Sequence, residues 1–153
     1  MTSAIETRLA ELGITLPEAP MPAANYVPFV RTGNQLFVSG QVAAGPEGMI
    51  LGKLGADMGL AEGAAAARRC GLSLLAQARA ALGDLDRVKR VVKLVGFVNS
   101  TADFTDQPKV INGCSDLMVE VFGEAGRHAR SAVSAASLPF GVAVEIEAIF
   151  EVE

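Results

Sequence analysis

Apolar residues recur at helical spacing in three stretches of the chain. The longest is residues 60–82, whose apolar positions (64, 67, 71, 74, 75, 78 and 82) leave Ser73 and Gln77 largely on the other side. Residues 106–123 repeat this pattern, and residues 4–12 show a shorter version of it. A period near 3.6 residues predicts an amphipathic helix in each place.

Strand-like runs fill most of the remaining chain. Residues 26–31 and 35–41 lie on either side of a Gly-Asn turn and predict a β-hairpin. Residues 88–98 are dense in Val, Leu and Phe, which is typical of a central strand covered on both faces. Residues 130–136 and 142–152 predict two more strands, which we expect to pair with each other.

The order of these elements predicts an α+β fold in a single domain, residues 1–153, with residues 1–13 as an N-terminal helical extension. Residues 42–58 lack a clear period and predict a loop with one short strand near 49–54. Two helices then cover one face of a mixed sheet. In the last strand Glu145 and Glu147 point to the opposite face, which is mixed enough in character to form a subunit interface.

Composition and charge narrow the functional classes. The net charge is −4 and the basic residues are scattered, which disfavours a nucleic-acid partner. No uncharged apolar run is long enough to span a membrane, and the N-terminal residues lack the basic region of a signal peptide. Cys70 and Cys114 lie far apart in helical patterns and are expected to be buried thiols in a reducing compartment. We therefore expect a cytoplasmic protein without a nucleic-acid or membrane partner.

The most informative motif lies near the C-terminus. His128-Ala129-Arg130-Ser131 opens one strand, and V-E-I-E-A-I follows after a Leu-Pro turn. Upstream, Tyr26 precedes the hairpin turn, Val38-Ser39-Gly40-Gln41 follows it, and Asn112 lies in the second long helix. From about residue 26 to 152 the chain resembles the RidA/YjgF family, which includes imine and enamine deaminases and proteins once called L-PSP ribonucleases.

The resemblance implies a chorismate-mutase-like homotrimer whose sheets line a central barrel and whose sites lie between subunits. It implies no cofactor. The family's deaminase site has an arginine for the substrate carboxylate and a glutamate with a bound water. By motif these catalytic roles fall on Arg130 and Glu145, and substrate binding falls on Arg130, Tyr26, Ser39, Gly40 and Asn112.

Two positions depart from the family pattern and place the chain in a divergent branch. Ala132 stands where the well-studied deaminases have a cysteine, and His128 stands where they usually have a proline.

The chemistry of these groups agrees with the resemblance. A guanidinium presents paired N–H donors in a plane, which matches a carboxylate in a way that lysine cannot. With the carboxylate of a 2-imino acid on Arg130, its C=N carbon would lie near Glu145, which could orient or deprotonate a water. The expected reaction is hydrolysis to a 2-keto acid and ammonia, with a small carboxylate metabolite as the partner.

Other interpretations stay open. Arg130 can be a surface ion-pair partner, Glu145 a solvated residue like Glu147, Tyr26 a half-buried core residue, and His128 a solvated loop residue. A non-catalytic binding or regulatory trimer that holds a 2-keto acid or an amino-acid-like metabolite on Arg130 is an alternative function. The ribonuclease activity historically attached to the family is a weaker one, because the chain is acidic and has a single histidine.

Overall fold

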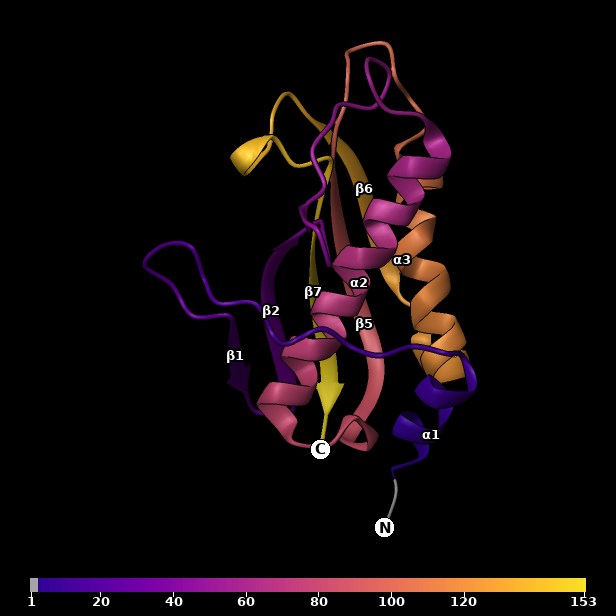
Figure 1. The fold of residues 1–153 in the computed structure, drawn as a ribbon. Helices are drawn as coiled ribbons and strands as arrows, with labels where there is room; N and C mark the ends of the chain where they lie inside the picture. The colour runs from indigo at the N-terminus through magenta and orange to yellow at the C-terminus, as the bar shows by residue number, and fades with distance from the viewer. Residues whose placement is uncertain (1–2) are drawn as a thin grey trace.

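The computed structural model describes residues 3–153, which form one mixed sheet with helices packed on one face (Figure 1). In chain order the elements are α1 (Ala4–Glu11), β1 (Phe29–Thr32), β2 (Gln35–Val42), β3 (Ala44–Gly45), β4 (Gly48–Met49), α2 (Leu60–Leu82), η1 (Leu85–Arg87), β5 (Val88–Asn99), α3 (Gln107–Phe122), η2 (Gly123–Gly126), β6 (Ala129–Ala135), η3 (Pro139–Gly141) and β7 (Val144–Val152). The predicted α+β class is confirmed, and the two long helices lie where their periodicity predicts them.

The five strands of the main sheet run in the order β1-β2-β7-β5-β6. β7 is antiparallel to both β2 and β5, whereas β6 is parallel to β5. The prediction that the two C-terminal strands pair with each other is therefore wrong. Because α3 serves as the crossover between β5 and β6, those two strands become parallel neighbours, and β7 occupies the other side of β5.

The helices pack closely through small residues. On α3 the predicted apolar stripe is buried throughout: Val110, Cys114, Leu117, Met118 and Val121. A Cβ on Gly113 would overlap the backbone of Ala64, so α2 and α3 can approach only because that position is glycine.

The N-terminal helix α1 is capped by the side chain of Ser3. The side chain of Ser3 accepts a hydrogen bond from the Glu6 amide, and Gly13 follows the helix with a φ of +70°. Asp86 in η1 accepts hydrogen bonds from the Ser3 hydroxyl and from the amides of Ala4 and Ile5. These bonds fix the start of α1 to the segment before β5. The predicted extension begins at residue 1, and its first two residues lie outside the described range.

One face of α2 differs from the prediction. Ser73 and Gln77 are buried, and the chain between α1 and β1 crosses over α2 (Figure 1). Gln77 Nε2 donates a hydrogen bond to the carbonyl oxygen of Pro20 at 2.6 Å. Gln77 therefore holds the start of residues 20–28, a protruding segment that we call the arm.

The predicted loop at residues 42–58 contains more structure than expected. Residues 44–45 pair with 48–49 to form the small β3–β4 hairpin. Leu51 makes an isolated bridge with Val142, and Leu54 makes one with Ser100. The predicted short strand near 49–54 is thus replaced by a hairpin and separate bridges.

The sheet face opposite the helices carries partly exposed apolar side chains. Val30 is 52%, Phe37 40% and Val133 45% exposed. Lys93, Val95 and Phe97 of β5 also lie partly exposed on this face, so the expectation that β5 is covered on both faces is wrong within the protomer. The alternation predicted for β7 is confirmed, since its helix-facing residues are buried and Glu147 is exposed.

Within residues 3–153, none of the helices combines the length and the apolar character needed to cross a membrane.

Candidate functional site

The predicted site residues form two clusters on opposite faces of the sheet. Arg130 is in register with Leu94 of β5, which is buried under the helices. Glu145 is in register with Phe97, three positions further along β5. Because successive side chains of a strand alternate, Leu94 and Phe97 point to opposite faces. Arg130 therefore lies on the helix side at edge strand β6, and Glu145 lies on the open face.

Arg130 is held by two neutral side chains of α3. Its Nη1 donates hydrogen bonds to Asn112 Oδ1 at 2.8 Å and to Ser115 Oγ at 3.1 Å. The ion pairs found in the described part of the chain involve other basic residues: Arg8, Arg68, Arg79, Lys109 and Arg127. Arg130 is therefore not a surface ion-pair partner in this structure, and its guanidinium has donors available for an external carboxylate.

His128 is the next member of this cluster. Its Nδ1 lies 2.6 Å from the carbonyl oxygen of Gly126, and its Nε2 lies 2.8 Å from Ser115 Oγ. Burial lowers the pKa of His128; the hydrogen bond to Gly126 opposes this shift in part, and the charge of Arg130 adds to it. The interpretation of His128 as a solvated loop residue is wrong in part: it lies in the connection between η2 and β6, but it is half-buried and both of its ring nitrogens are engaged by Gly126 and Ser115.

Glu145 lies in a cavity of about 720 Å³ on the open face. Tyr26, Ser39 and Gly40 line the same cavity, so four of the predicted residues are brought together. Burial raises the pKa of the Glu145 carboxyl, and the neighbouring Glu147 adds to this effect. Glu145 thus differs from Glu147, which is exposed on the same strand face.

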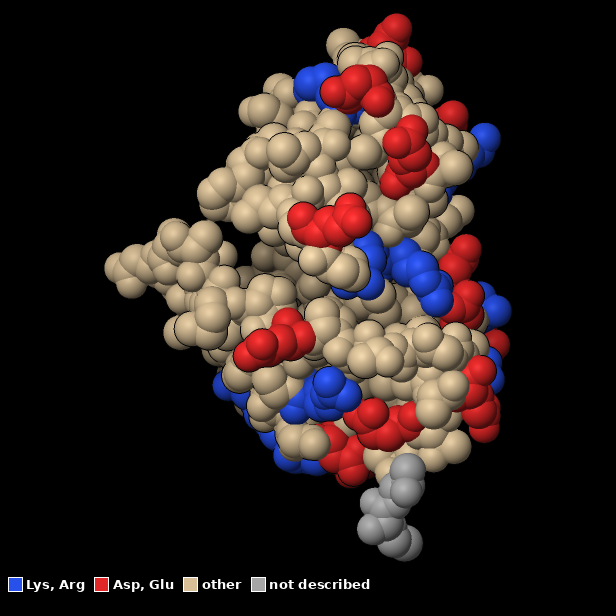
Figure 2. All heavy atoms as spheres, in the orientation of Figure 1, with Lys and Arg blue, Asp and Glu red and all other residues tan. Residues whose placement is uncertain are grey.

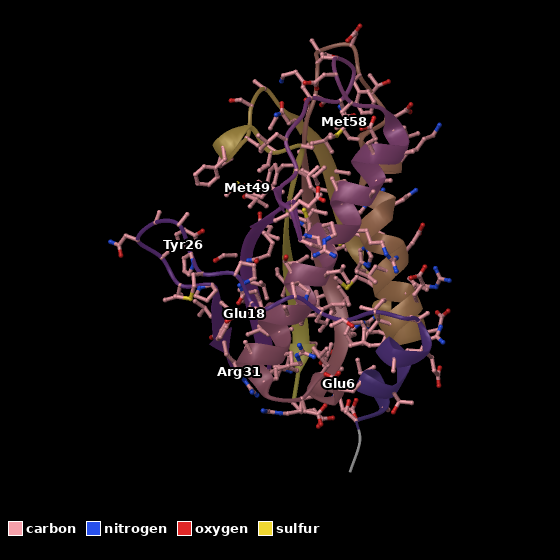
Figure 3. The ribbon with its side chains drawn as sticks, viewed as in Figure 1. Glu6, Glu18, Tyr26, Arg31, Met49 and Met58 are labelled. Atoms are coloured by element: carbon pink, nitrogen blue, oxygen red, sulfur yellow. The ribbon has the colours of Figure 1, made fainter. Side chains whose placement is uncertain are left out.

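The wall of this cavity is largely apolar. Met21, Tyr26, Met49 and Phe140 line it. Figure 3 shows Tyr26 on the arm and Met49 on β4, and Figure 2 shows a hollow between the uncharged arm and the body of the protein. Phe140 adopts a left-handed backbone conformation, with φ 61° and ψ 4°, and is 60% exposed. Such a conformation costs an aromatic residue about 1–2 kcal/mol, and strained residues of this kind cluster at functional sites.

Gly40 makes room for the Glu145 carboxyl group. The pairing of β2 with β7 shifts register between Val38 and Gln41, and Gly40 lies in that irregularity. A Cβ on Gly40 would overlap the carboxyl group of Glu145. The S-G-Q segment therefore needs glycine at this position for a local steric reason.

Ser39 holds the arm and does not present a free hydroxyl to the cavity. Its Oγ donates to the carbonyl oxygen of Val27 at 2.8 Å, and its amide donates to that of Pro28 at 2.9 Å. These bonds fix the end of the arm, so that Tyr26, 49% exposed, lies at the cavity wall.

Sequence reasoning missed Ser115 and Gln77 as residues that position the site. Ser115 follows Asn112 by three positions on α3, so the two share one face of the helix, and that spacing was a usable signal. Gln77 offered no comparable signal, because its partner is a backbone carbonyl far away in the sequence.

The cysteines play no part in either cluster. Cys70 and Cys114 are free and buried, as predicted. Burial raises the pKa of the Cys114 thiol to about 12 and also raises that of Cys70, so neither side chain is a thiolate near neutral pH. Among the residues described, no three or more His, Cys, Asp or Glu side chains form a group that could hold a metal ion.

Comparison with known proteins identifies the class. Residues 6–150 match the family model described as "YjgF/chorismate_mutase-like, putative endoribonuclease". The chain belongs to this family, which confirms the predicted relationship and fold.

Individual relatives place the chain more closely within the family. Protein TCP17 of Trypanosoma cruzi is 56% identical over 149 residues, 96% of this chain and 93% of that protein. The crystal structure of Atu1372 from Agrobacterium tumefaciens, a protein of unknown function, is 51% identical, with a TM-score of 0.90 over 97% of this chain and 92% of that one. E. coli TdcF with bound serine is 27% identical, with a TM-score of 0.63 over 89% of this chain and 94% of that one.

Proposed function

We propose that the protein hydrolyses 2-imino or enamino acids to 2-keto acids and ammonia, in a site that two subunits of a homotrimer build together. The observation that carries this proposal is the separation of Arg130 and Glu145 onto opposite faces of one sheet. Among the described residues, the cluster around Arg130 contains no carboxylate, and the cavity that holds Glu145 is lined by no basic side chain. A second copy of the chain, packed on the partly exposed apolar face, would bring one subunit's Arg130 to another subunit's Glu145.

Arg130 would bind the substrate carboxylate. Asn112 and Ser115 occupy its Nη1, and the structure gives its other N–H groups no hydrogen-bond partner within residues 3–153. These groups can form charge-assisted hydrogen bonds to a carboxylate. TdcF was solved with bound serine, a small carboxylate with an adjacent nitrogen, which supports this ligand class.

Glu145 would handle the water. An elevated pKa makes a carboxylate a stronger base, closer to the range in which proton transfer near neutral pH is efficient. In the proposed step a water oxygen bonds to C2 of the protonated imine and gives a proton to Glu145. The proton then passes to the amino group, the C–N bond breaks, and ammonia leaves as the C2 hydroxyl loses its proton to form the keto acid.

The scheme does not need the cysteine that Ala132 replaces, because water is the nucleophile. The apolar wall formed by Met21, Met49 and Phe140 favours substrates with an apolar side chain over charged ones.

A non-catalytic trimer that binds 2-keto acids is the second candidate. The observation in its favour is that the Ser39 hydroxyl is already engaged by Val27, which leaves fewer polar groups for catalysis.

Release of ammonia from imines, generated in situ by an amino-acid oxidase, separates these two candidates. The deaminase account expects the protein to accelerate release over buffer, and expects Glu145→Gln to lose that acceleration while it still binds 2-oxobutyrate. Binding of 2-oxobutyrate by the wild-type protein without any acceleration would establish the binding protein instead.

A further inference from the structure

A continuous chain of hydrogen bonds leads to Arg130 from the end of η2. It runs from the Gly126 carbonyl oxygen to His128 at 2.6 Å, from His128 to Ser115 at 2.8 Å, and from Ser115 to Arg130 at 3.1 Å. The carbonyl oxygen can only accept, so Nδ1 of a neutral His128 carries the proton and Nε2 accepts from the Ser115 hydroxyl. The lone pairs of Ser115 Oγ then face the guanidinium.

We propose that Ser115 and His128 are positioning residues, which hold the Arg130 guanidinium in the orientation that receives a ligand carboxylate. The inference rests on the proposed role of Arg130 as the carboxylate anchor. It adds two residues to the site, one of them at the position where the family usually has proline.

Two acceptors are needed because one would not fix the guanidinium plane. Asn112 alone leaves Arg130 free to rotate about a single hydrogen bond, whereas Asn112 and Ser115 together restrain Nη1 from two points on one helix face. An arginine restrained before binding loses less side-chain freedom when the ligand arrives.

His128 acts through Ser115. A serine hydroxyl rotates freely and can turn its proton toward Arg130, where donor would face donor. Because Nε2 of His128 takes that proton, Ser115 is left as an acceptor. A neutral ring is required for this, and burial together with the charge of Arg130 lowers the pKa of His128 by more than the Gly126 hydrogen bond raises it.

The alternative is that these two residues only stabilise the junction of η2 and β6. That role predicts a loss of stability without a selective effect on the ligand. A double-mutant cycle with Arg130 separates the two roles, because the positioning effect must vanish once the guanidinium is gone.

The experiment measures 2-oxobutyrate affinity by calorimetry, together with KM and kcat for imine hydrolysis. In Ser115→Ala and His128→Leu we expect affinity to fall about three- to tenfold, the factor that one net hydrogen bond supplies. KM should rise while kcat changes little, and His128→Gln, which retains an acceptor, should restore part of the affinity. In an Arg130→Ala background, Ser115→Ala should have no further effect.

Ser134→Ala is the matched control. Ser134 also lies on β6 and its Oγ is 2.7 Å from Ser100 Oγ, but it belongs to a different cluster. Its replacement should leave 2-oxobutyrate affinity unchanged.

Nuclear magnetic resonance gives an independent readout, because the chain has a single histidine. The ring should show the tautomer with the proton on Nδ1 and should respond to 2-oxobutyrate in the wild-type protein but not in Arg130→Ala. The opposite tautomer, or wild-type affinity in Ser115→Ala, overturns the inference alone. A wild-type protein that neither binds 2-oxobutyrate nor hydrolyses imines overturns the proposed function and this inference with it.

Discussion

The proposed chemical role of Glu145 comes with a cost to stability, because partial burial disfavours its charged form. Its pKa is higher in the folded chain than in the unfolded one. Its contribution to stability is therefore fully present below the unfolded pKa and is lost as the pH rises through the folded pKa.

We predict that Glu145→Gln is at least as stable as the wild type at neutral pH and that its advantage shrinks as the medium becomes acidic. Thermal unfolding of both proteins, followed from neutral to acidic pH, measures this difference in stability. The same substitution should lower turnover by about 100-fold or more, since it removes the proposed general base. Unchanged turnover in Glu145→Gln would exclude a catalytic role for Glu145.

A substitution at Gly40 tests whether the position of the Glu145 carboxyl group matters for turnover. In Gly40→Ala the new Cβ would meet the end of the Glu145 side chain, which can move aside, so the fold should persist while the carboxyl shifts. We expect kcat to fall by about tenfold or more, as misplaced catalytic groups do, while 2-oxobutyrate affinity is kept. Gly59→Ala is the control, because its Cβ meets nothing closer than 3.8 Å. Full activity in Gly40→Ala would show that the position of Glu145 does not matter.

The proposed role of Arg130 as carboxylate anchor is tested by measuring the affinity for 2-oxobutyrate. Arg130→Ala should weaken 2-oxobutyrate binding about tenfold or more, because charge-assisted hydrogen bonds to the carboxylate are lost. Arg130→Lys should recover only part of this, since an ammonium keeps the charge but lacks the planar pair of donors. Calorimetry measures both variants, and wild-type affinity in Arg130→Ala would exclude the anchor role.

At the scale of elements, local periodicity was enough to predict α2 and α3, because a helix forms its backbone hydrogen bonds within itself. Strand pairing depends on partners far apart in the sequence, so the separation of β6 from β7 by β5 was not visible. The burial of Gln77 was missed for the same reason, because Pro20, which accepts its hydrogen bond, is distant in the chain.

As with the fold, the sequence predicted only part of the candidate site. The motifs assign these residues to one site, and within the protomer the structure divides them: Arg130 contacts Asn112, whereas Glu145 lines a cavity with Tyr26 and Gly40. They did not reveal that Ser39 would be engaged by the arm or that His128 would be held by Ser115. Both depend on side-chain hydrogen bonds that have no period in the sequence.

The arm provides a prediction at this scale. The chain has one tyrosine and no tryptophan, so tyrosine fluorescence reports Tyr26 alone. Ser39→Ala removes the hydrogen bond to Val27 and should loosen the arm, which lowers the fluorescence anisotropy of Tyr26 and raises KM. If the anisotropy stays at the wild-type value, Ser39 does not hold the arm.

At the scale of the whole molecule, the proposal requires the partly exposed sheet face to be covered by another copy of the chain. The apolar residues Val30, Phe37 and Val133 on that face favour burial in an assembly. A site built from two subunits has a consequence that a site within one subunit lacks. Two variants that are each inactive can restore activity when they assemble together.

The most direct test is therefore complementation between Arg130→Ala and Glu145→Gln. Co-expressed in equal amounts, the two variants should form mixed trimers in which about a quarter of the sites combine an intact Arg130 with an intact Glu145. At substrate concentrations well below KM, the account predicts imine hydrolysis at about a quarter of the wild-type rate per site, and about a tenth or less from either variant alone. Wild type co-expressed with the double variant is the control and should give the same fraction. Mixed assemblies that remain as inactive as the separate variants would contradict the shared site.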